Sequence, residues 1–340
     1  MKEKNIIGLF FTDLHLSDLS LQVCKDFIGK MCIYSKENNI KNIIFGGDFF
    51  ECRKGLTQDT LIVANEIFEN LHELQSNIYF LVGNHDKANP LINNSYLTPF
   101  KKYFTLFDEV GFINLNSELI NIYFLPYFEG EALKDQFEKL KLLVENNKNT
   151  NYKNVLLMHL MYEQIPVEIS KNFDLILAGH SHDLQEFPRG KYIGSCYQQN
   201  FAEDKYKGFT LLYNNLTTKQ ILFPSKEYIT QTIDLNFFTE EKAKEFITNF
   251  KKKNKDKYLR IEFKGFNKDI SILKDFCKQN NIDCISKIEI LSNNSEEKGE
   301  QVTISTLSKE QIQNYYEEFK KNQTYSDEVN DLLNKVLFEN

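Results

Sequence analysis

The sequence contains no tryptophan, only 6 cysteines among 340 residues, and no apolar run near the length of a membrane span. A helix needs about 20 consecutive apolar residues to cross a bilayer, so a membrane-spanning segment is excluded. The cysteines form no Cys-x-x-Cys pair, which argues against zinc knuckles and disulfides and favours reduced thiols in a cytoplasmic setting. The N-terminal residues lack the cleavage site of a secretion signal. The missing tryptophan, together with abundant Lys, Asn and Ile, indicates an AT-rich source genome.

The net charge of −7 argues against a surface covered with basic residues, although a local basic patch remains compatible with it. Hydrophobic residues make up 41% of the chain, so it has enough apolar side chains for a substantial core. Its length suits two domains, or one large domain with an appendage.

Apolar runs alternate with amphipathic stretches along the first part of the chain. Strands are predicted over 5–12, 43–45 and 78–82, with helices from about Ser17 and over 58–74 between them. Ser17 or Asp18 is the expected cap of the first helix. This β-α-β-α-β order predicts an α/β layered domain. Later elements are two short apolar stretches within 107–128, a helix over 131–146, and strands over 155–158, 175–178, 191–194, 209–213 and 219–223.

Polar side chains follow five of these apolar strands at the point where each strand ends. In open α/β sheets, ligands bind outside the carboxyl ends of the strands. Five of the six histidines occupy such ends, whereas His72 lies on the predicted 58–74 helix and is interpreted as an ordinary helix residue. The strand-end residues are Asp13, His15, Asp48, Asn84, His85, His159, His180 and His182.

The order Asp-x-His, Gly-Asp, Gly-Asn-His-Asp, a lone His and Gly-His-x-His resembles the calcineurin-like metallophosphoesterase pattern over about residues 5–225. The resemblance implies a four-layer α/β/β/α sandwich, and catalysis by two divalent metal ions. His85 would stay off the metals and act on the phosphate, while Asp86 would orient His85 or hold the turn. One ion would be bound by Asp13, His15, Asp48 and His182, and the other by Asp48, Asn84, His159 and His180.

The chemistry of the donors also bears on the metal. Oxygen and imidazole ligands without thiolate suit Mn²⁺ or a similar ion better than Ca²⁺, and Mg²⁺ remains possible. The acid at position 51 stands where cellular relatives usually carry a histidine that supports the catalytic one. A carboxylate beside His85 would favour its protonated form, so the hypothesis is that Glu51 keeps His85 cationic.

The segment after Gly-His-x-His resembles one branch of this family in particular. Tyr192-Ile193-Gly194-Ser195, Phe201-Ala202-Glu203-Asp204 and Lys207-Gly208-Phe209 are similar to SbcD-like DNA exonucleases, and residues 47–54 look most like bacteriophage recombination nuclease subunits. This implies a DNA nuclease, with double-strand exonuclease and single-strand endonuclease activity, in an SbcCD-like complex for recombination or DNA-end processing. The alternatives are a stand-alone metallophosphodiesterase or protein phosphatase of the same fold, and a non-catalytic scaffold, which the complete ligand set disfavours.

The resemblance also divides the chain into a nuclease domain over 1–225, a small α+β capping domain over 226–291 that guides DNA, a linker over 292–306 and C-terminal helices over 307–340. Those helices would bind the coiled coil of an SbcC-like ABC-type ATPase, and two nuclease subunits would form a homodimer in the cytoplasm, or in the host cytoplasm for a bacteriophage protein. A lysine run in the cap would either contact DNA phosphates or stay solvated at a helix end. It consists of Lys251, Lys252, Lys253, Lys255 and Lys257.

Overall fold

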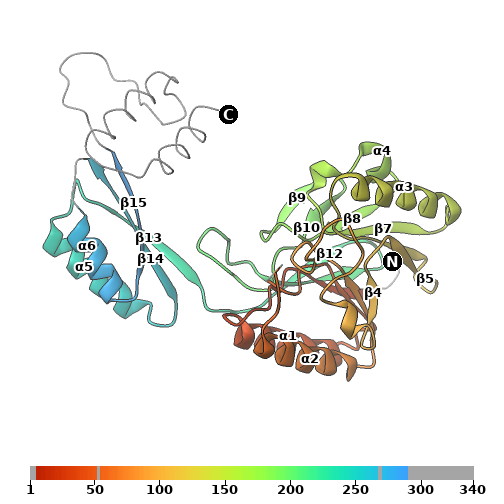
Figure 1. Cartoon of the computed structure of the whole chain (residues 1–340), viewed down its shortest axis with the longest axis horizontal. Coiled ribbons are helices and arrows are strands. Elements are labelled where there is room, and N and C mark those ends of the chain that lie inside the picture. The colour runs from red at the N-terminus through yellow and green to blue at the C-terminus, as the bar shows by residue number, and fades with distance from the viewer. Residues whose placement is uncertain (1–4, 52–53, 267–269, 290–340) are drawn as a thin grey trace, which may run out of the picture. The chain divides into compact units, whose positions relative to one another are not determined.

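The computed structural model describes residues 5–51, 54–266 and 270–289. The predicted linker over 292–306 and the predicted partner-binding helices over 307–340 lie outside this part. Residues up to 289 group into one compact unit, and Figure 1 labels most of its helices and strands.

The first sheet has six strands in the order β12-β11-β1-β2-β3-β4. Strands β1 to β4 pair in parallel, and β11 and β12 add an antiparallel edge. Helices α1 and α2 are the crossover connections between β1, β2 and β3, as parallel pairing requires. The bounds are β1 Ile6–Phe11, α1 Leu21–Glu37, β2 Asn42–Phe45, α2 Gln58–His72, β3 Asn77–Leu81, a 3₁₀ turn Thr98–Phe100, β4 Thr105–Phe107, β11 Gly208–Tyr213 and β12 Thr218–Leu222.

The second sheet also has six strands, in the order β5-β6-β7-β8-β10-β9. Its central strands pair in parallel, while β5 and β9 are antiparallel edges. The bounds are β5 Gly111–Leu115, β6 Ile120–Leu125, α3 Gly130–Asn146, β7 Lys153–Met158, a 3₁₀ turn Tyr162–Gln164, α4 Val167–Ser170, β8 Leu175–Ala178, β9 Gln185–Phe187 and β10 Gly190–Tyr192.

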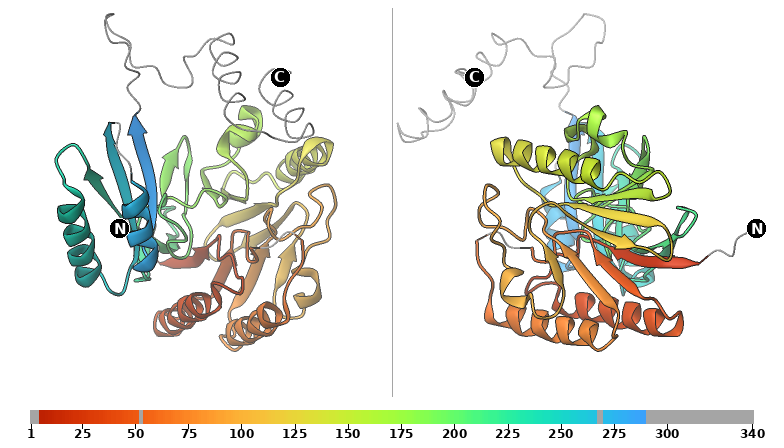
Figure 2. Two further views of the ribbon diagram at one scale, coloured as in Figure 1. Left: turned by 60° about the vertical axis from the view of Figure 1, so that its left-hand side comes forward. Right: turned by 90° about the vertical axis from the view of Figure 1, so that its right-hand side faces the viewer.

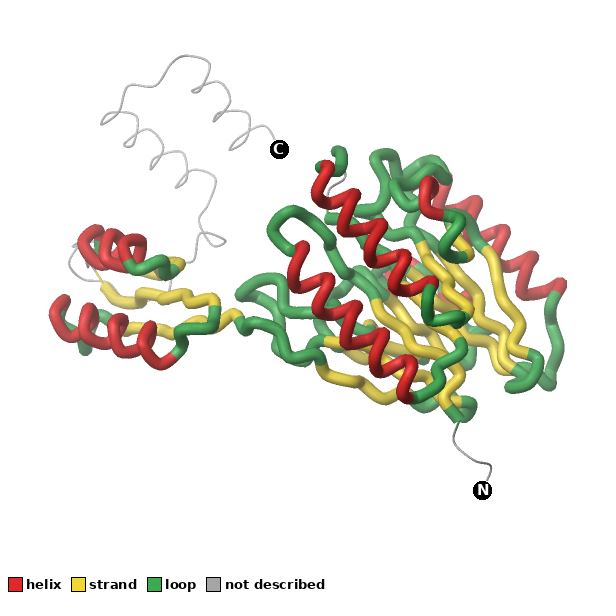
Figure 3. The backbone as a smooth tube through the Cα atoms, turned by 90° about the horizontal axis from the view of Figure 1, so that it is seen from below, coloured by secondary structure: helices red, strands yellow, loops and turns green. Residues whose placement is uncertain are grey.

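The two sheets pack face to face through one buried apolar cluster. It joins Phe10 and Leu81 of the first sheet to Phe124 and Leu157 of the second, and the rings of Phe107 and Phe124 stack with centroids 3.8 Å apart. Separate apolar clusters pack α1 and α2 on the outside of the first sheet and α3 on the outside of the second. The right-hand view of Figure 2 shows the strands between these helices, and Figure 3 shows helices on both sides of the strands. The predicted four-layer α/β/β/α sandwich is confirmed.

Helix α1 begins later than the sequence predicts. Its N-cap is Ser20, and no side chain caps the first turn. Asp18, one of the two expected caps, instead accepts hydrogen bonds from the hydroxyls of Thr57 and Thr60 at the start of α2. The expected cap was wrong because the Asp18 carboxylate binds a neighbouring helix rather than its own.

Residues 228–289 form a third sheet with its own core. Strands β13 Tyr228–Asp234, β14 Tyr258–Phe266 and β15 Asp283–Glu289 are parallel, and they alternate with α5 Glu240–Lys253 and α6 Ser271–Gln279. Apolar side chains from all five elements form a cluster separate from those of the first two sheets.

None of the helices in the described residues is both long and apolar enough to cross a membrane. The five cysteines within the described part, Cys24, Cys32, Cys196, Cys277 and Cys284, are free thiols.

Candidate metal centre

The carboxyl ends of five parallel strands meet at one edge of the sandwich. The chain leaves β1 at Asp13 and β2 at Asp48, and the Asp13 amide donates to the carbonyl of Gly47 across this edge, at 2.9 Å. The predicted ligands other than Asn84, together with the proposed catalytic His85, fall into sets whose donor atoms all lie within 4.8 Å of one another. These sets are Asp13 with His15 and His182, Asp48 with His159 and His180, and His15 with Asp48 and His85.

The first half of the centre consists of Asp13, His15 and His182. The Nε2 atoms of His15 and His182 are 3.1 Å apart. Both lie close to one carboxylate oxygen of Asp13, at 3.7 and 3.6 Å. Asp13 is completely buried, so its carboxylate is shielded from solvent and interacts with the surrounding donor groups.

The second half consists of Asp48, Asn84, His159 and His180. The Nε2 atom of His159 is 3.1 Å from an Asp48 carboxylate oxygen and 3.1 Å from Oδ1 of Asn84. The same Asn84 oxygen is 2.9 Å from Nδ1 of His180. Asp48 also approaches His15 of the first half, at 3.7 Å, so its carboxylate lies between the two halves.

Three of the histidines are oriented by oxygen acceptors on their outer side. His159 donates from Nδ1 to the carbonyl of Gly46 at 2.8 Å, and His182 donates from Nδ1 to the Glu203 carboxylate at 2.8 Å. Nδ1 of His15 contacts the Glu51 carboxylate. Each ring therefore turns Nε2 towards the buried carboxylates, which is the arrangement that metal-binding histidines adopt.

The backbone at the centre is unusual. Asp13, His15, Asp48 and His180 are four of the ten non-glycine residues with positive φ in the described part of the chain. Positive φ disfavours residues with a Cβ atom, and such strain gathers at functional sites where surrounding contacts impose it. The backbone at these strand ends thus adopts an unfavourable conformation, and this conformation places the candidate ligands.

Two glycines allow this close approach. A Cβ on Gly83 would lie 2.2 Å from an Asp48 carboxylate oxygen, and a Cβ on Gly47 would lie 2.3 Å from Nδ1 of His159. Gly47 also has φ of +107°, where other residues are strained. Any side chain at either position would displace a candidate ligand.

The electrostatics of the centre favour a cation. Burial alone would lower the pKa of His15 and His159, but the neighbouring carboxylates raise it to about 10 and about 9. The imidazoles keep the pKa of Asp13 and Asp48 below the usual value, against the effect of burial. Burial, together with the nearby His159, lowers the pKa of His180 to about 4. The carboxylates stay ionised and stabilise positive charge between them, which fits divalent metal ions.

The structure gives Glu51 a different partner from the one the sequence predicts. Its carboxylate contacts His15, whereas His85 approaches the backbone carbonyl of Glu51, with Nδ1 2.6 Å away. The His85 amide donates to the Asp48 carboxylate at 2.7 Å. The main chain at position 51 therefore orients His85, and the Glu51 side chain orients His15, whereas the hypothesis that Glu51 keeps His85 cationic stays a prediction.

Asp86 is completely buried and binds the backbone of the neighbouring turns. Its carboxylate accepts hydrogen bonds from the amides of Gly83, Asp48, Phe49 and Phe50, at 2.9 to 3.0 Å. Burial and the nearby Asp48 raise its pKa to about 6. These contacts favour the turn-holding role over the orientation of His85.

Sequence reasoning missed the supports of His182. The Glu203 side chain is 6% exposed and binds Nδ1 of His182. Lys207, with its side chain 1% exposed, donates to the carbonyl of His182 at 2.6 Å and to Asp183 at 2.7 Å. Both residues lie in motifs that pointed to a branch of the family, but spacing alone gave no indication of their contacts.

A cavity of about 440 Å³ opens beside the centre. His15, His85 and His182 line one part of it, and Tyr228 and Tyr258 line another. His85 is therefore the candidate residue that faces both the metal ligands and a space large enough for a nucleotide-sized ligand.

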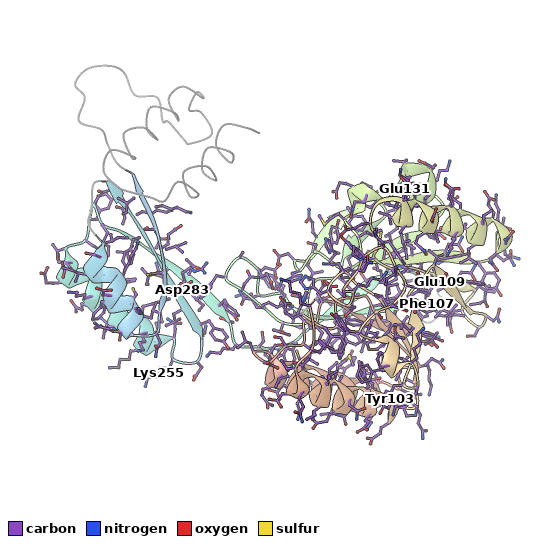
Figure 4. All side chains as sticks on the ribbon, viewed as in Figure 1. Tyr103, Phe107, Glu109, Glu131, Lys255 and Asp283 are labelled. Atoms are coloured by element: carbon purple, nitrogen blue, oxygen red, sulfur yellow. The ribbon has the colours of Figure 1, made fainter. Side chains whose placement is uncertain are left out.

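The lysine run lies at the end of α5 and in the loop before β14. Lys251, Lys252 and Lys253 occupy the last turn of α5, where they complement the helix dipole. Lys251, Lys255 and Lys257 line a second cavity of about 460 Å³, together with Asp283. Figure 4 labels Lys255 and Asp283. Lys257 also pairs with Glu227 at 2.8 Å, so part of the run's charge is already compensated.

The chain belongs to the calcineurin-like phosphoesterase family, whose model matches residues 9–184. The membership predicted from the motif order is thus confirmed, and this family implies divalent metal ions.

Two curated relatives lie in the DNA-processing branch that the later motifs resemble. The DNA double-strand break repair protein Mre11 of Methanocaldococcus jannaschii is 28% identical over 215 residues, which cover 59% of this chain and 58% of the relative. Exonuclease subunit 1 of Enterobacteria phage T4 is 26% identical over 182 residues, which cover 50% of this chain and 52% of the relative. The chain thus matches little more than half the length of either relative.

Solved structures show weaker likeness. A dimetal phosphatase from Danio rerio aligns with a TM-score of 0.46 and 9% identity, covering 62% of this chain and 93% of that one. The nuclease MPE of Pseudomonas putida aligns with a TM-score of 0.30 and 14% identity, covering 54% of this chain and 66% of that one. Both scores are too low to support a functional conclusion.

Proposed function

We propose that this chain is a DNA nuclease that hydrolyses phosphodiester bonds with two divalent metal ions. The observation that carries the proposal is the orientation of His15, His159 and His182, which all turn Nε2 towards two buried carboxylates. Donors of nitrogen and oxygen without thiolate favour Mn²⁺, with Mg²⁺ as the other suitable ion.

The division of ligands follows the two halves of the centre. Asp48 lies between them and is the proposed bridging ligand. When bound, the two ions supply positive charge to the phosphoryl oxygens and lower the pKa of the attacking water. One ion would be held by Asp13, His15, Asp48 and His182, and the other by Asp48, Asn84, His159 and His180.

His85 is the proposed catalytic residue. Its Nδ1 is directed at the Glu51 carbonyl, which leaves Nε2 for the phosphate in the adjoining cavity. From that position the imidazole stabilises the phosphate or protonates the leaving oxygen. Asp86 fixes the turn on which His85 stands, and Glu51 and Glu203 keep His15 and His182 in place.

DNA as the substrate is supported by the names of the two relatives, one a DNA repair protein and the other an exonuclease subunit. The word "subunit" in the second name also supports a partner protein. In this proposal residues 226–291 form the cap that guides DNA, and 307–340 bind an SbcC-like ATPase. A homodimer of the nuclease, with double-strand exonuclease and single-strand endonuclease activity, remains part of the same prediction.

One assay tests the proposal. The full chain is incubated with Mn²⁺, Mg²⁺ or EDTA, and with linear duplex DNA, single-stranded DNA or small phosphate esters, with and without an ATPase partner. Metal-dependent DNA cleavage is expected. Cleavage of small esters alone would indicate a stand-alone phosphodiesterase or phosphatase, and metal binding without turnover of any substrate would indicate a scaffold.

A further inference from the structure

Three aromatic rings form a continuous surface beside the candidate metal centre, which we call the aromatic ledge (Phe201, Tyr228 and Tyr258). The rings of Phe201 and Tyr228 meet edge to face with centroids 5.0 Å apart. Those of Tyr228 and Tyr258 stack with centroids 4.3 Å apart. Tyr258 remains 43% exposed, so the ledge still presents aromatic surface to solvent.

The ledge is fixed to the loop that supports the centre. The buried side chain of Gln198 accepts a hydrogen bond from the Tyr228 amide at 3.0 Å and donates one to the Tyr228 carbonyl at 3.3 Å. The same Gln198 amide donates to the carbonyl of Glu203 at 2.9 Å, and Glu203 orients His182. The ledge and the first half of the centre are thus connected by one chain of hydrogen bonds.

Cationic side chains accompany the rings. Nζ of Lys226 lies 4.0 Å from the centroid of Tyr258, and the guanidinium of Arg260 lies 4.1 Å from that of Phe201. Arg260 also pairs with Asp283, whereas Lys226 lines both cavities. Alternating rings and cations are typical of proteins that bind single-stranded nucleic acid, because bases stack on the rings and phosphates contact the cations.

The two cavities share Tyr258 and Lys226. The cavity of about 440 Å³ reaches from them to His85, and that of about 460 Å³ continues to Lys251 and Lys255. These features define a path that leads from basic residues, over aromatic surface, to the proposed catalytic histidine.

We propose that the aromatic ledge is a stacking subsite for one unpaired nucleobase, which directs a neighbouring phosphodiester towards His85. A base inside a duplex has both faces covered by its neighbours, whereas an unpaired base has a free face that can stack on Tyr258 in place of the flexible Lys226 side chain, whose Nζ lies over that ring. The inference rests on the proposed nuclease function and deepens it: the preferred substrate is single-stranded or frayed DNA rather than fully paired duplex.

Binding without cleavage tests the subsite directly. The full chain in EDTA is titrated into a single-stranded oligonucleotide that contains one 2-aminopurine, whose fluorescence falls on stacking. Tyr258→Leu, which keeps apolar bulk but removes the ring, is expected to lose the quenching and to weaken binding by about fivefold or more, the loss of one base–ring stack. Tyr258→Phe keeps the ring and is expected to behave as the unsubstituted chain.

Phe237→Leu is the matched control, because Phe237 is an aromatic residue of the same domain that is 83% exposed and lines neither cavity. Quenching and affinity that are equal in Tyr258→Leu and the unsubstituted chain would overturn the subsite. Binding of fully paired duplex as tight as that of the single strand would overturn the preference.

A cleavage assay distinguishes failure of the subsite proposal from failure of the nuclease proposal. With Mn²⁺, Tyr258→Leu is expected to cleave a strand of abasic residues at the unsubstituted rate and to lose efficiency only on strands that carry bases. Equal losses on both strands would show that Tyr258 acts other than by stacking. If the unsubstituted chain cleaves no DNA, the nuclease proposal fails, and the quenching in EDTA still decides whether the ledge binds a base.

Discussion

The parallel strands β1-β2-β3 and the parallel strands β13-β14-β15 share a β-α-β-α-β order, but their polar residues lie in different places. In β1-β2-β3 the carboxyl ends lead into buried polar residues, including Asp13, Asp48 and Asn84. In β13-β14-β15 the charges lie on a sheet face instead. There Glu262 accepts a hydrogen bond from Thr232 at 2.8 Å and pairs with Lys287 at 2.6 Å.

The difference teaches that topology sets where a ligand can bind, and that the residues after each strand decide whether one does. At the first sheet Asp13 and Asp48 have positive φ and buried carboxylates. At the third sheet the polar contacts link neighbouring strands. Substitutions should therefore affect chemistry in the first sheet and stability in the third.

The largest effect is expected for Asp48→Ala, which removes the carboxylate between the two halves of the centre. Metal content should fall, and Mn²⁺-dependent DNA cleavage should fall by more than about 10³-fold, beyond the loss of one positioned donor. Metal analysis by mass spectrometry and a cleavage assay measure this. Asp26→Asn, an exposed acid on α1, is the control, and full metal content in Asp48→Ala would contradict the assignment.

His85→Ala should separate catalysis from metal binding at the same sheet edge. Cleavage is expected to fall by about 10² to 10⁴-fold, the usual contribution of a positioned proton donor, while both metals stay bound. His72→Ala on α2, outside the centre, should leave cleavage unchanged. Loss of metal from His85→Ala, seen by calorimetric titration with Mn²⁺, would show that His85 is a ligand.

The supports of the histidines should have smaller effects. Glu203→Gln keeps an acceptor for His182 but removes the charge, and metal affinity is expected to fall about tenfold or more. Glu51→Gln should cost less, because the Glu51 side chain is 49% exposed and that of Glu203 only 6%. Titration with Mn²⁺ measures both, with Glu186→Gln as an exposed control. A greater loss in Glu51→Gln would reverse the ranking.

The smallest effect is expected for the third sheet, in the way that the stability of the fold depends on acidic pH. Hydrogen bonds from Lys287 and Thr232 lower the pKa of Glu262 to about 2. A carboxyl whose folded pKa is lowered stabilises the fold above its unfolded pKa of 4.5, and this contribution disappears as pH falls towards about 2. Glu262→Gln should therefore flatten the decline of stability over that window and leave DNA cleavage unchanged.

Thermal unfolding followed by circular dichroism across that pH window checks the Glu262 prediction. Glu245→Gln, at an exposed position on α5, provides the control. If the stability of Glu262→Gln and of the unsubstituted chain fell equally with pH, the ionised Glu262 would not stabilise the third sheet, and the prediction would be wrong.

The positions of the candidate ligands followed from the sequence because parallel strands end at a common edge. Apolar runs before Asp13, Asp48 and His159 located the strand ends, because short continuous apolar runs bounded by turn residues are typical of strands buried on both faces. The family match later agreed with the motif order.

What the sequence could not give were contacts made by side chains across loops. Glu203 reaches His182 across 21 positions that include β9 and β10, and no periodicity governs such pairs. The Glu51 carboxylate points to His15 instead of His85 because the backbone carbonyl of the same residue already occupies Nδ1 of His85. The start of α1 shifted because Asp18 binds another helix.

The placement of the ligands on both sheets has a consequence for assembly of the molecule. Asp13 and Asp48 follow strands of the first sheet, whereas His159 and His182 follow strands of the second. A bound ion would therefore cross-link the two sheets in a protein whose described cysteines are all free. A ligand at about 100 times its dissociation constant stabilises the folded state by about 2.7 kcal/mol. The ions of this centre would therefore also stabilise the packing of the two sheets, and they could bind only after the two sheets have packed together.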